Sequence, residues 1–295
     1  MMREEFSLNS AADGIALACY RWLAPEPAAG LVQIAHGMGE HSLRYAAFAD
    51  KLNRAGFHVY ANDHRGHGRT AATQDQLGDF GAGGWNGLVA DLALLTHHAH
   101  AAHSTLPIVL LGHSMGSFAA QQYLLEHSGI IAGVILSGSA SLDRLFASAA
   151  VPRDSSQPAD LTALNRDFEP ARTPFDWLSR DPAEVDKYVA DPLCGFGIDA
   201  RATVSMAAGG RRTVDSAEVA QIRKNLPIYI FAGDKDPVNH HLEWLRPLSE
   251  RYRAAGITDV TEKFYQDGRH EMLNETNRAE VMRDTVAWLR RTIAK

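Results

Sequence analysis

The sequence has little of what marks secreted or membrane-spanning proteins. Its 295 residues include only two cysteines, Cys19 and Cys194, so we expect no disulfide framework and a reducing, cytoplasmic location. The first ten residues, MMREEFSLNS, lack the apolar stretch of a secretory signal. No run approaches the roughly 18 uncharged apolar residues of a membrane-spanning helix. Peripheral contact with a lipid surface remains compatible with this composition.

An excess of basic charge is also missing. Lys and Arg total 29 against 35 for Asp and Glu, which gives a formal net charge of -6 and a pI near 6.1. No basic run offers a footprint for phosphates, so nucleic acid is not an expected partner. We also expect no cofactor.

Histidine, in contrast, is plentiful, with 14 residues. Four of them fall on one predicted helix: His97, His98, His100 and His103. Cysteine or acidic partners of the usual kind are not near them, so a solvated helix face is a better interpretation than a metal site. Cys194 is interpreted as a small apolar filler.

Apolar runs alternate with helical segments along most of the chain. Strands are predicted at 4–10, 15–23, 31–37, 57–63, 107–114, 132–140, 226–236 and 260–266. Helices are predicted at 42–55, 85–103, 115–127, 240–255 and 276–293. This alternation indicates an α/β fold with a mainly parallel central sheet flanked by helices. It stops between 141 and 224, which predicts a core of 1–140 and 225–295 with a mostly helical cap insertion at 141–224.

A Gly-x-Ser-x-Gly motif lies between a predicted strand and a predicted helix. Its residues are Gly112, Ser114 and Gly116, in the run GHSMG. Such a turn is sharp and lifts the serine above the end of the sheet, where side chains in place of the glycines would collide with neighbouring backbone. A chance occurrence in a loop would lack this setting, so Ser114 is the predicted nucleophile.

A serine hydroxyl needs a base to take its proton, normally a histidine oriented by a carboxylate. After a turn of this kind the chain order is serine, acid, histidine. His270 follows the last predicted strand, in a loop that can reach across the strand ends, and is the predicted base. His240 and His241 directly follow the acid loop, where capping or packing is the expected role.

The acid is expected in the run AGDKDPV at 232–238, which offers Asp234 and Asp236. Both are also ordinary turn formers. The tetrahedral intermediate needs two backbone donors. The N–H groups of Met115, directly after the serine, and of Met38, in the loop after the strand at 31–37, are the predicted oxyanion hole. His36 is expected to orient that loop.

Five motifs in this order resemble the monoglyceride lipase and bacterial lysophospholipase group of α/β-hydrolases, a group often given a serine aminopeptidase (S33) domain name. They are HGMGEHSLRY (36–45), NDHRGHGRT (62–70), GHSMGS (112–117), AGDKDPV (232–238) and GRHEMLNE (268–275). The resemblance covers nearly all of the chain outside the insertion. It implies an α/β-hydrolase fold, a triad of Ser114, Asp236 and His270, an oxyanion hole at Met38 and Met115, and a cap at 141–224.

Two positions depart from the group's pattern. Thr70 replaces a usual serine and keeps the hydroxyl. Leu273 stands where animal monoglyceride lipases have a second histidine near the glycerol, although the accompanying Glu40 and Arg44 are present and four residues apart, close enough to pair. The bacterial lysophospholipase-like branch therefore fits better.

The insertion contributes aromatic residues that would suit an acyl-chain pocket. Phe146, Phe175 and Trp177 are predicted substrate contacts, together with Glu40 and Arg44; the aromatics would serve equally as the cap's own core. The predicted activity is hydrolysis of acyl esters such as monoacylglycerols or lysophospholipids through an acyl-enzyme.

Two other functions stay open at this point. One is a peptidase or amidase, for which the sequence shows no acid to bind the substrate amine. The other is a non-catalytic ligand sensor, a class that commonly loses a member of the triad. The sequence carries no signal of oligomeric state.

Overall fold

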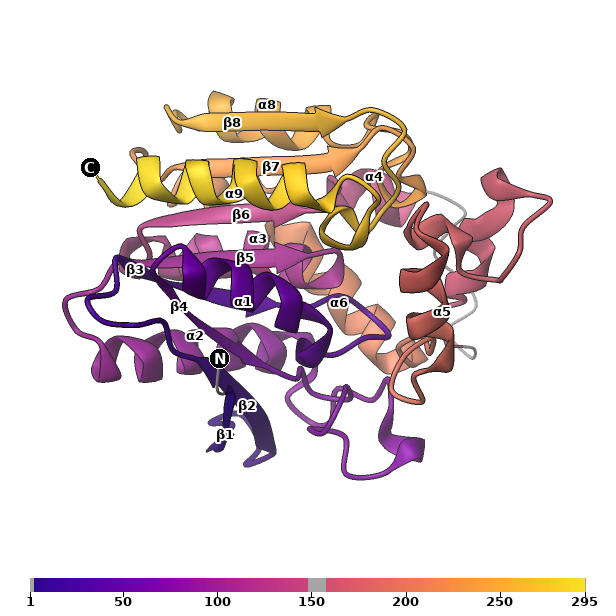
Figure 1. Cartoon of the computed structure of the whole chain (residues 1–295), viewed down its shortest axis with the longest axis horizontal. Helices are drawn as coiled ribbons and strands as arrows, with labels where there is room; N and C mark the ends of the chain where they lie inside the picture. Colours follow the sequence, from indigo (N-terminus) through magenta and orange to yellow (C-terminus); the bar gives the residue numbers. More distant parts are fainter. Residues whose placement is uncertain (1–2, 148–157, 295) are drawn as a thin grey trace.

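A computed structural model describes residues 3–147 and 158–294 (Figure 1). Its centre is one eight-stranded sheet with the order β1-β2-β4-β3-β5-β6-β7-β8. The strands are β1 Arg3–Asn9, β2 Ala16–Trp22, β3 Gly30–Ala35, β4 Phe57–Asn62, β5 Ile108–His113, β6 Gly133–Ser137, β7 Ile228–Gly233 and β8 Val260–Tyr265. Strands β3 to β8 pair in parallel, whereas β1 and β2 run antiparallel at one edge. The predicted mainly parallel sheet is confirmed.

The strands differ in burial according to their place in the sheet. Every residue of β3, β4, β5, β6 and β7 is buried, as expected for parallel strands covered by helices on both faces. The edge strand β1 alternates between exposed and half-buried residues. The carboxyl ends of the parallel strands meet at one end of the sheet, which is where ligands bind in open α/β sheets.

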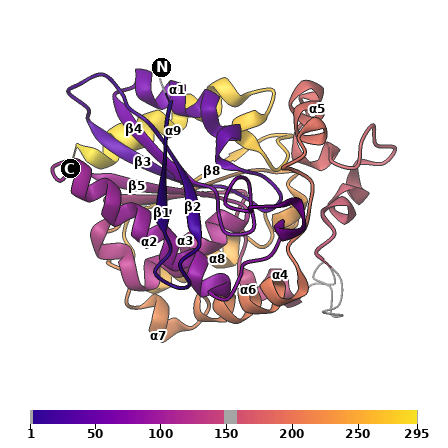
Figure 2. The same ribbon diagram turned by 90° about the horizontal axis from the view of Figure 1, so that it is seen from below.

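Helices cover both faces of the sheet, and each face has its own apolar core. The helices of the core are α1 Ala46–Arg54, α2 Gly84–Ala102, α3 Met115–His127, α8 Arg246–Ala254 and α9 Arg278–Ile293. Side chains of α1 and α9 pack on one face, and those of α2, α3 and α8 on the other; Figures 1 and 2 show the two layers. None of the described helices is both long and apolar enough to cross a membrane.

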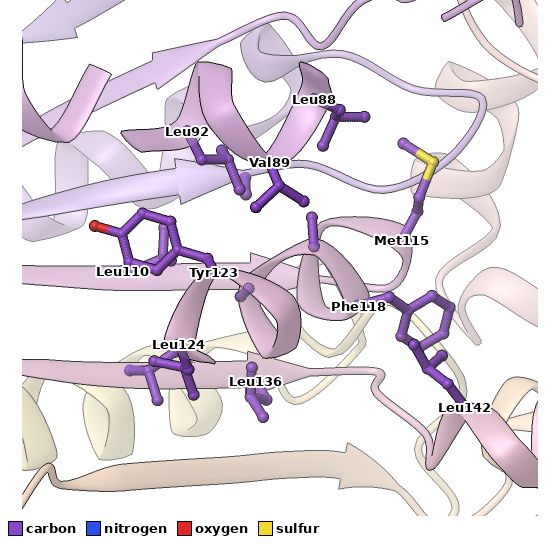
Figure 3. Close-up of a cluster of buried hydrophobic side chains, with 14 of the residues drawn as sticks. Leu88, Val89, Leu92, Leu110, Met115, Phe118, Tyr123, Leu124, Leu136 and Leu142 are labelled. Atoms are coloured by element: carbon purple, nitrogen blue, oxygen red, sulfur yellow. The ribbon is translucent and has the colours of Figure 1, made fainter. Parts of the chain in front are cut away.

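The core beneath the Gly-x-Ser-x-Gly turn is shown in Figure 3. Leu88 and Leu92 of α2 face Leu110 of β5 and the side chains of α3, among them Met115 and Phe118. All five are buried. Because α3 packs on strands β3, β5 and β6 and against the neighbouring helix α2, its first turn is held in place.

The inserted segment is helical in the part that the structure describes, without a strand. Its helices are α4 Leu142–Ala147, α5 Pro182–Ala190, α6 Ala200–Arg212 and α7 Ser216–Val219, with shorter 3-10 helices at Leu161–Phe168 and Asp176–Leu178. α6 packs against α2, where the N–H of Trp85 donates to Ser205 Oγ (2.9 Å). A Cβ on Gly209 would overlap the Trp85 ring. α6 thus flanks the sheet, whereas α5 lies beyond the strand ends (Figure 1).

One predicted helix, 240–255, begins late, at Arg246. His240, His241 and Leu242 have φ values of 51°, 54° and 75°, which a right-handed helix cannot contain. A 3-10 turn, Pro237–Asn239, follows the Asp236 cap and leads into this left-handed segment. None of these three residues is glycine, so the sequence carried no signal of the left-handed backbone.

Candidate active site

Ser114 lies at the turn between β5 and α3, with φ 50° and ψ -122°. A positive φ at a residue other than glycine is strained and persists only where the surrounding structure enforces it. Its N–H donates to the carbonyl of Ser137 in the neighbouring strand β6 (2.9 Å). The turn therefore projects Ser114 from the carboxyl end of the sheet.

The two glycines of the motif permit this turn for steric reasons. A Cβ on Gly112 would overlap the backbone of Gly116, at the start of α3. A Cβ on Gly116 would overlap the carbonyl oxygen of Ala35, at the end of β3. Strand β5, helix α3 and strand β3 approach one another too closely at the nucleophile for any larger residue.

Asp236 and His270 come from different loops and contact each other, and His270 lines the same cavity as Ser114. Nδ1 of His270 lies 2.9 Å from Oδ1 of Asp236. The two residues lie in the loops that follow the carboxyl ends of β8 and β7. Asp236 is fully buried and also accepts the N–H of Val238 and the amide of Asn239, both at 2.9 Å. Burial lowers the pKa of His270, but the Asp236 carboxylate, together with the charges of Glu271 and Glu40, raises it by more in total, so the pKa lies above its usual value.

The inserted segment contacts the His270 loop directly. The N–H of His270 donates to the carbonyl of Trp177 (3.4 Å), and that of Glu271 donates to Leu178 (2.7 Å). The Trp177 ring lies against the imidazole, with the centroids 5.0 Å apart. On the core side the ring of His113 lies 4.7 Å from it. These contacts fix the plane of the buried imidazole.

The loop after β3 approaches Ser114 from the opposite side. A Cβ on Gly37 would lie 3.1 Å from Cβ of Ser114. The N–H of Gly37 donates to the buried carboxylate of Glu40 (2.5 Å), which also accepts the hydroxyl of Tyr45 (2.8 Å). Met38 and Met115 line a cavity together with Ser114; that their N–H groups form the oxyanion hole stays a prediction.

A buried histidine pair supports this loop from below. His36 Nε2 accepts the N–H of His64 (2.9 Å), so its proton is on Nδ1, which donates to the carbonyl of Gly37 (2.8 Å). His64 Nε2 in turn donates to the carbonyl of His36 (3.1 Å). Burial lowers the pKa of both, that of His64 to about 3. Both rings are therefore neutral, and their hydrogen bonds hold the loop in place.

Arg44 joins the loop to the segment after His270. It donates to Glu40 (2.7 Å) and, through two nitrogens, to Glu271 (2.5 and 2.7 Å). The predicted pairing of Glu40 with Arg44 is present. Glu271, 227 residues away from Arg44 along the chain, completes a buried trio.

These groups open into one cavity of about 410 Å³. Apart from the residues around Ser114, its wall is mostly apolar and includes Phe118, Leu145, Leu161, Leu164, Met206 and Val238. Trp177 lines it, as predicted from its place in the insertion. Cavities with an apolar wall and a few convergent polar groups suit small organic ligands.

Phe146 and Phe175 are not among the described residues that line this cavity. Phe146 packs on α6, where a Cβ on Gly210 would lie 2.6 Å from its ring. Phe175 packs on Tyr188 of α5, with the ring centroids 5.0 Å apart. For these two aromatics the structure shows packing within the insertion, the alternative that the sequence left open.

The other titratable candidates have structural partners. Asp234 accepts the N–H of Asp267 (2.8 Å) and lies outside the His270 pair. His240 contacts Glu243 (2.7 Å), and His241 contacts Asp167 (3.0 Å) in the insertion. Neither histidine lines the cavity in the part of the chain that the structure describes.

His97 and His100 of the histidine-rich helix α2 are exposed, as the predicted solvated face requires, whereas the other two histidines pack on neighbouring rings. His98 stacks on Phe6, and His103 contacts the hydroxyl of Tyr60 (3.0 Å). One group outside this helix brings potential metal ligands together: His41, Asp191 and Cys194, whose ligand atoms lie within 4.8 Å of one another. His41 and Asp191 already bind each other at 2.9 Å.

Three residues that line the cavity were not predicted from the sequence. Tyr188 lines the cavity from α5, Met206 from α6, and Glu271 beside His270. Only Glu271 had a usable signal, since it directly follows the predicted base. The positions of Tyr188 and Met206 depend on how the insertion folds, which its irregular pattern does not reveal.

Comparison with known proteins agrees with this geometry. Residues 26–277 match the family model described as "Serine aminopeptidase, S33". The chain is similar to a monoacylglycerol lipase from Mycolicibacterium smegmatis, with 30% identity over 91% of this chain and 90% of the relative. It is 29% identical to human monoglyceride lipase, over 76% of this chain and 71% of that protein.

Solved structures include a thermostable carboxyl esterase from Bacillus coagulans in complex with glycerol, with a TM-score of 0.86, 30% identity and 99% of both chains covered. A monoglyceride lipase from Saccharomyces cerevisiae, at 20% identity, shares the fold with a TM-score of 0.78 over 99% of this chain and 95% of that one. Since the family model spans most of the sequence, the chain belongs to the S33 serine aminopeptidase family of α/β-hydrolases, in the group that includes the monoglyceride lipases.

Proposed function

We propose that this protein is a serine hydrolase of acyl esters, with monoacylglycerols and lysophospholipids as the substrate class. The observation that carries the proposal is the position of Ser114, on a strained turn in the wall of a mostly apolar cavity that is also lined by His270, the partner of Asp236. The relatives of about 30% identity that cover most of this chain are lipases and esterases, which supports ester hydrolysis over the other functions of the family.

The acylation step would use His270 as the base. His270 Nε2 takes the proton of Ser114 as Oγ forms a bond to the ester carbonyl carbon. Meanwhile the Nδ1–H group of His270 keeps its hydrogen bond to the Asp236 carboxylate. The N–H groups of Met38 and Met115 hold the resulting oxyanion. The tetrahedral intermediate then collapses, the bond to the alcohol oxygen breaks, and His270 returns its proton to the leaving alcohol.

Deacylation repeats these steps with water. His270 takes a proton from water as its oxygen attacks the acyl carbon, and Ser114 leaves with that proton as the fatty acid is released. The positioned Asp236 carboxylate stabilises the imidazolium in both halves, which agrees with the raised pKa of His270. No cofactor enters these steps.

Glu40 and Glu271 are the carboxylates that line the cavity near Ser114 among the described residues. Both are bound to Arg44. We further propose that 141–224 acts as the cap, with its described part supplying Leu161, Leu164 and Trp177 to the acyl-chain pocket.

A fluorophosphonate probe tests the assignment. We expect the wild-type protein to be labelled at one site and to hydrolyse monolauroylglycerol, and Ser114→Ala to lose both properties. Ser216→Ala is the matched control, because Ser216 is exposed on α7, away from the cavity. Labelling of Ser114→Ala as strongly as wild type would end the proposal.

A second assay separates the alternatives. An ester hydrolase should cleave monolauroylglycerol and leave leucine p-nitroanilide intact, whereas an aminopeptidase would do the reverse. A ligand sensor would bind a lauroyl ester without turnover, although Ser114, Asp236 and His270 are all present.

A further inference from the structure

Glu271 brings a second carboxylate into the wall of the cavity, beside Glu40. Their shared partner Arg44 is not among the described residues that line the cavity, and its guanidinium lies over the ring of Tyr188 at 4.8 Å. The two carboxylates therefore face the cavity, and the Arg44 guanidinium lies on their far side. The trio of Glu40, Arg44 and Glu271 presents its negatively charged side to the cavity.

The trio has one net negative charge. Burial raises the pKa of Glu271, but Arg44 lowers it further, to about 2, so the carboxylate is ionised at neutral pH. Two carboxylates and one guanidinium leave one uncompensated charge. The other charged side chains in the described wall, Asp160 and Arg166, are exposed, lie on the insertion and have opposite signs.

The negative charge lies close to His270, which in the proposed reaction protonates the leaving alcohol. His270 has to reach the alcohol oxygen to protonate it, and Glu271 is the next residue. The charges of Glu271 and Glu40 act on the imidazole of His270, where they add to the effect of Asp236 on its pKa. The apolar wall formed by residues such as Phe118 and Met206 is left for the acyl chain.

The cavity also offers a neutral polar group. The side chain of Tyr188 lines the cavity and is 2% exposed. Its hydroxyl can donate or accept a hydrogen bond. An uncharged alcohol with a second hydroxyl group offers such a partner.

We propose that Glu271 makes the leaving-group end of the cavity negative and so selects acyl esters of uncharged alcohols over those of anionic alcohols. The inference rests on the proposed ester hydrolase function and narrows its substrate class. Monoacylglycerols are accepted, acylglycerol phosphates are excluded, and lysophospholipids are disfavoured because their phosphodiester anion lies close to the ester.

Matched lauroyl esters test this selection. The probes are monolauroylglycerol, lauroyl-lysophosphatidylcholine and lauroyl-lysophosphatidate, each at monomeric concentration. For the wild-type protein we expect kcat/KM to fall in that order. In Glu271→Gln, which keeps the shape of the side chain and an oxygen for Arg44, the ratio between the neutral and the anionic ester should narrow at least about tenfold, since one charge within a few ångströms acts at low effective dielectric.

The ratio is the readout, because any general loss of activity in the variant cancels in it. Glu271→Asp keeps the charge and should keep the discrimination, and Glu184→Gln, on the outer turn of α5, should leave the ratio at its wild-type value. Equal wild-type turnover of the neutral and anionic esters would overturn the inference whether or not a variant folds, as would an unchanged ratio in Glu271→Gln. A wild-type protein inactive on all three esters would instead overturn the proposed function itself.

Discussion

The backbone N–H of Glu271 donates to the carbonyl of Leu178 at 2.7 Å, so the residue after His270 is held by the inserted segment. Arg269, on the other side of His270, donates to the carbonyls of Asp176 and Ser179, and its guanidinium lies 4.4 Å from the centre of the Phe168 ring. The proposed base is therefore positioned from both sides by the segment that covers the strand ends.

Removal of the Arg269 side chain should loosen this support. In Arg269→Ala we expect kcat on a soluble lauroyl ester to fall by about tenfold or more, with a smaller change in KM, since small misplacements of a catalytic group are costly. Arg172→Ala removes an exposed arginine of the same segment, bound to Asp186, and should match wild type. An equal change in both variants would count against a positioning role for Arg269.

The pH dependence of turnover should report the His270–Asp236 pair. Only neutral His270 takes the serine proton, and the pair raises its pKa above 6.5, so activity should rise with pH through a midpoint above that value. In Asp236→Asn the carboxylate is gone and burial dominates, which should move the midpoint to lower pH while kcat falls on the order of 10³- to 10⁴-fold. A pH–rate profile of both proteins measures this, and an unmoved midpoint in the variant would contradict it.

Gly37 should tolerate no side chain, even alanine. Its Cβ would lie 2.8 Å from the Glu40 carboxylate and 3.1 Å from Cβ of Ser114, so the loop with the Met38 N–H would have to shift. We expect Gly37→Ala to lower kcat by about a hundredfold or more, the loss seen when one oxyanion donor is removed. Gly129→Ala, where a Cβ meets nothing within 4 Å, is the control, and circular dichroism should show both variants folded.

Arg65 should be important for stability. It is completely buried and donates to Asp13, Asp91 and the carbonyl of Phe80. Arg65→Ala would leave Asp91 without its buried partner, and we expect the free energy of unfolding to fall by about 3–5 kcal/mol. Arg69→Ala breaks an exposed pair with Glu5 and should cost less than about 1 kcal/mol. Urea unfolding of the three proteins decides the comparison.

Much of the fold was readable in the sequence because its signals are local. Continuous apolar runs marked the central strands, and their ends differ from the predicted bounds by at most three residues. The strand–turn–helix setting identified the turn at Ser114, and the order of the motifs placed Asp236 and His270 in loops that meet.

The features that escaped prediction depend on contacts across the chain. The Arg44–Glu271 pair joins residues 227 positions apart, and nothing near either residue signals the other. The late start of α8 depends on left-handed residues without glycine. Phe146 packs on Gly210, where the absence of a side chain leaves space for its ring, and Phe175 packs on the ring of Tyr188.

The strained backbone of Ser114 has a consequence for stability. A residue held at φ 50° and ψ -122° costs of order 1–3 kcal/mol, and glycine at the same place would relieve most of it. Stability favours glycine at position 114, whereas the proposed reaction requires serine there. Ser114→Gly should therefore raise the thermal stability of the protein while it abolishes the proposed reaction.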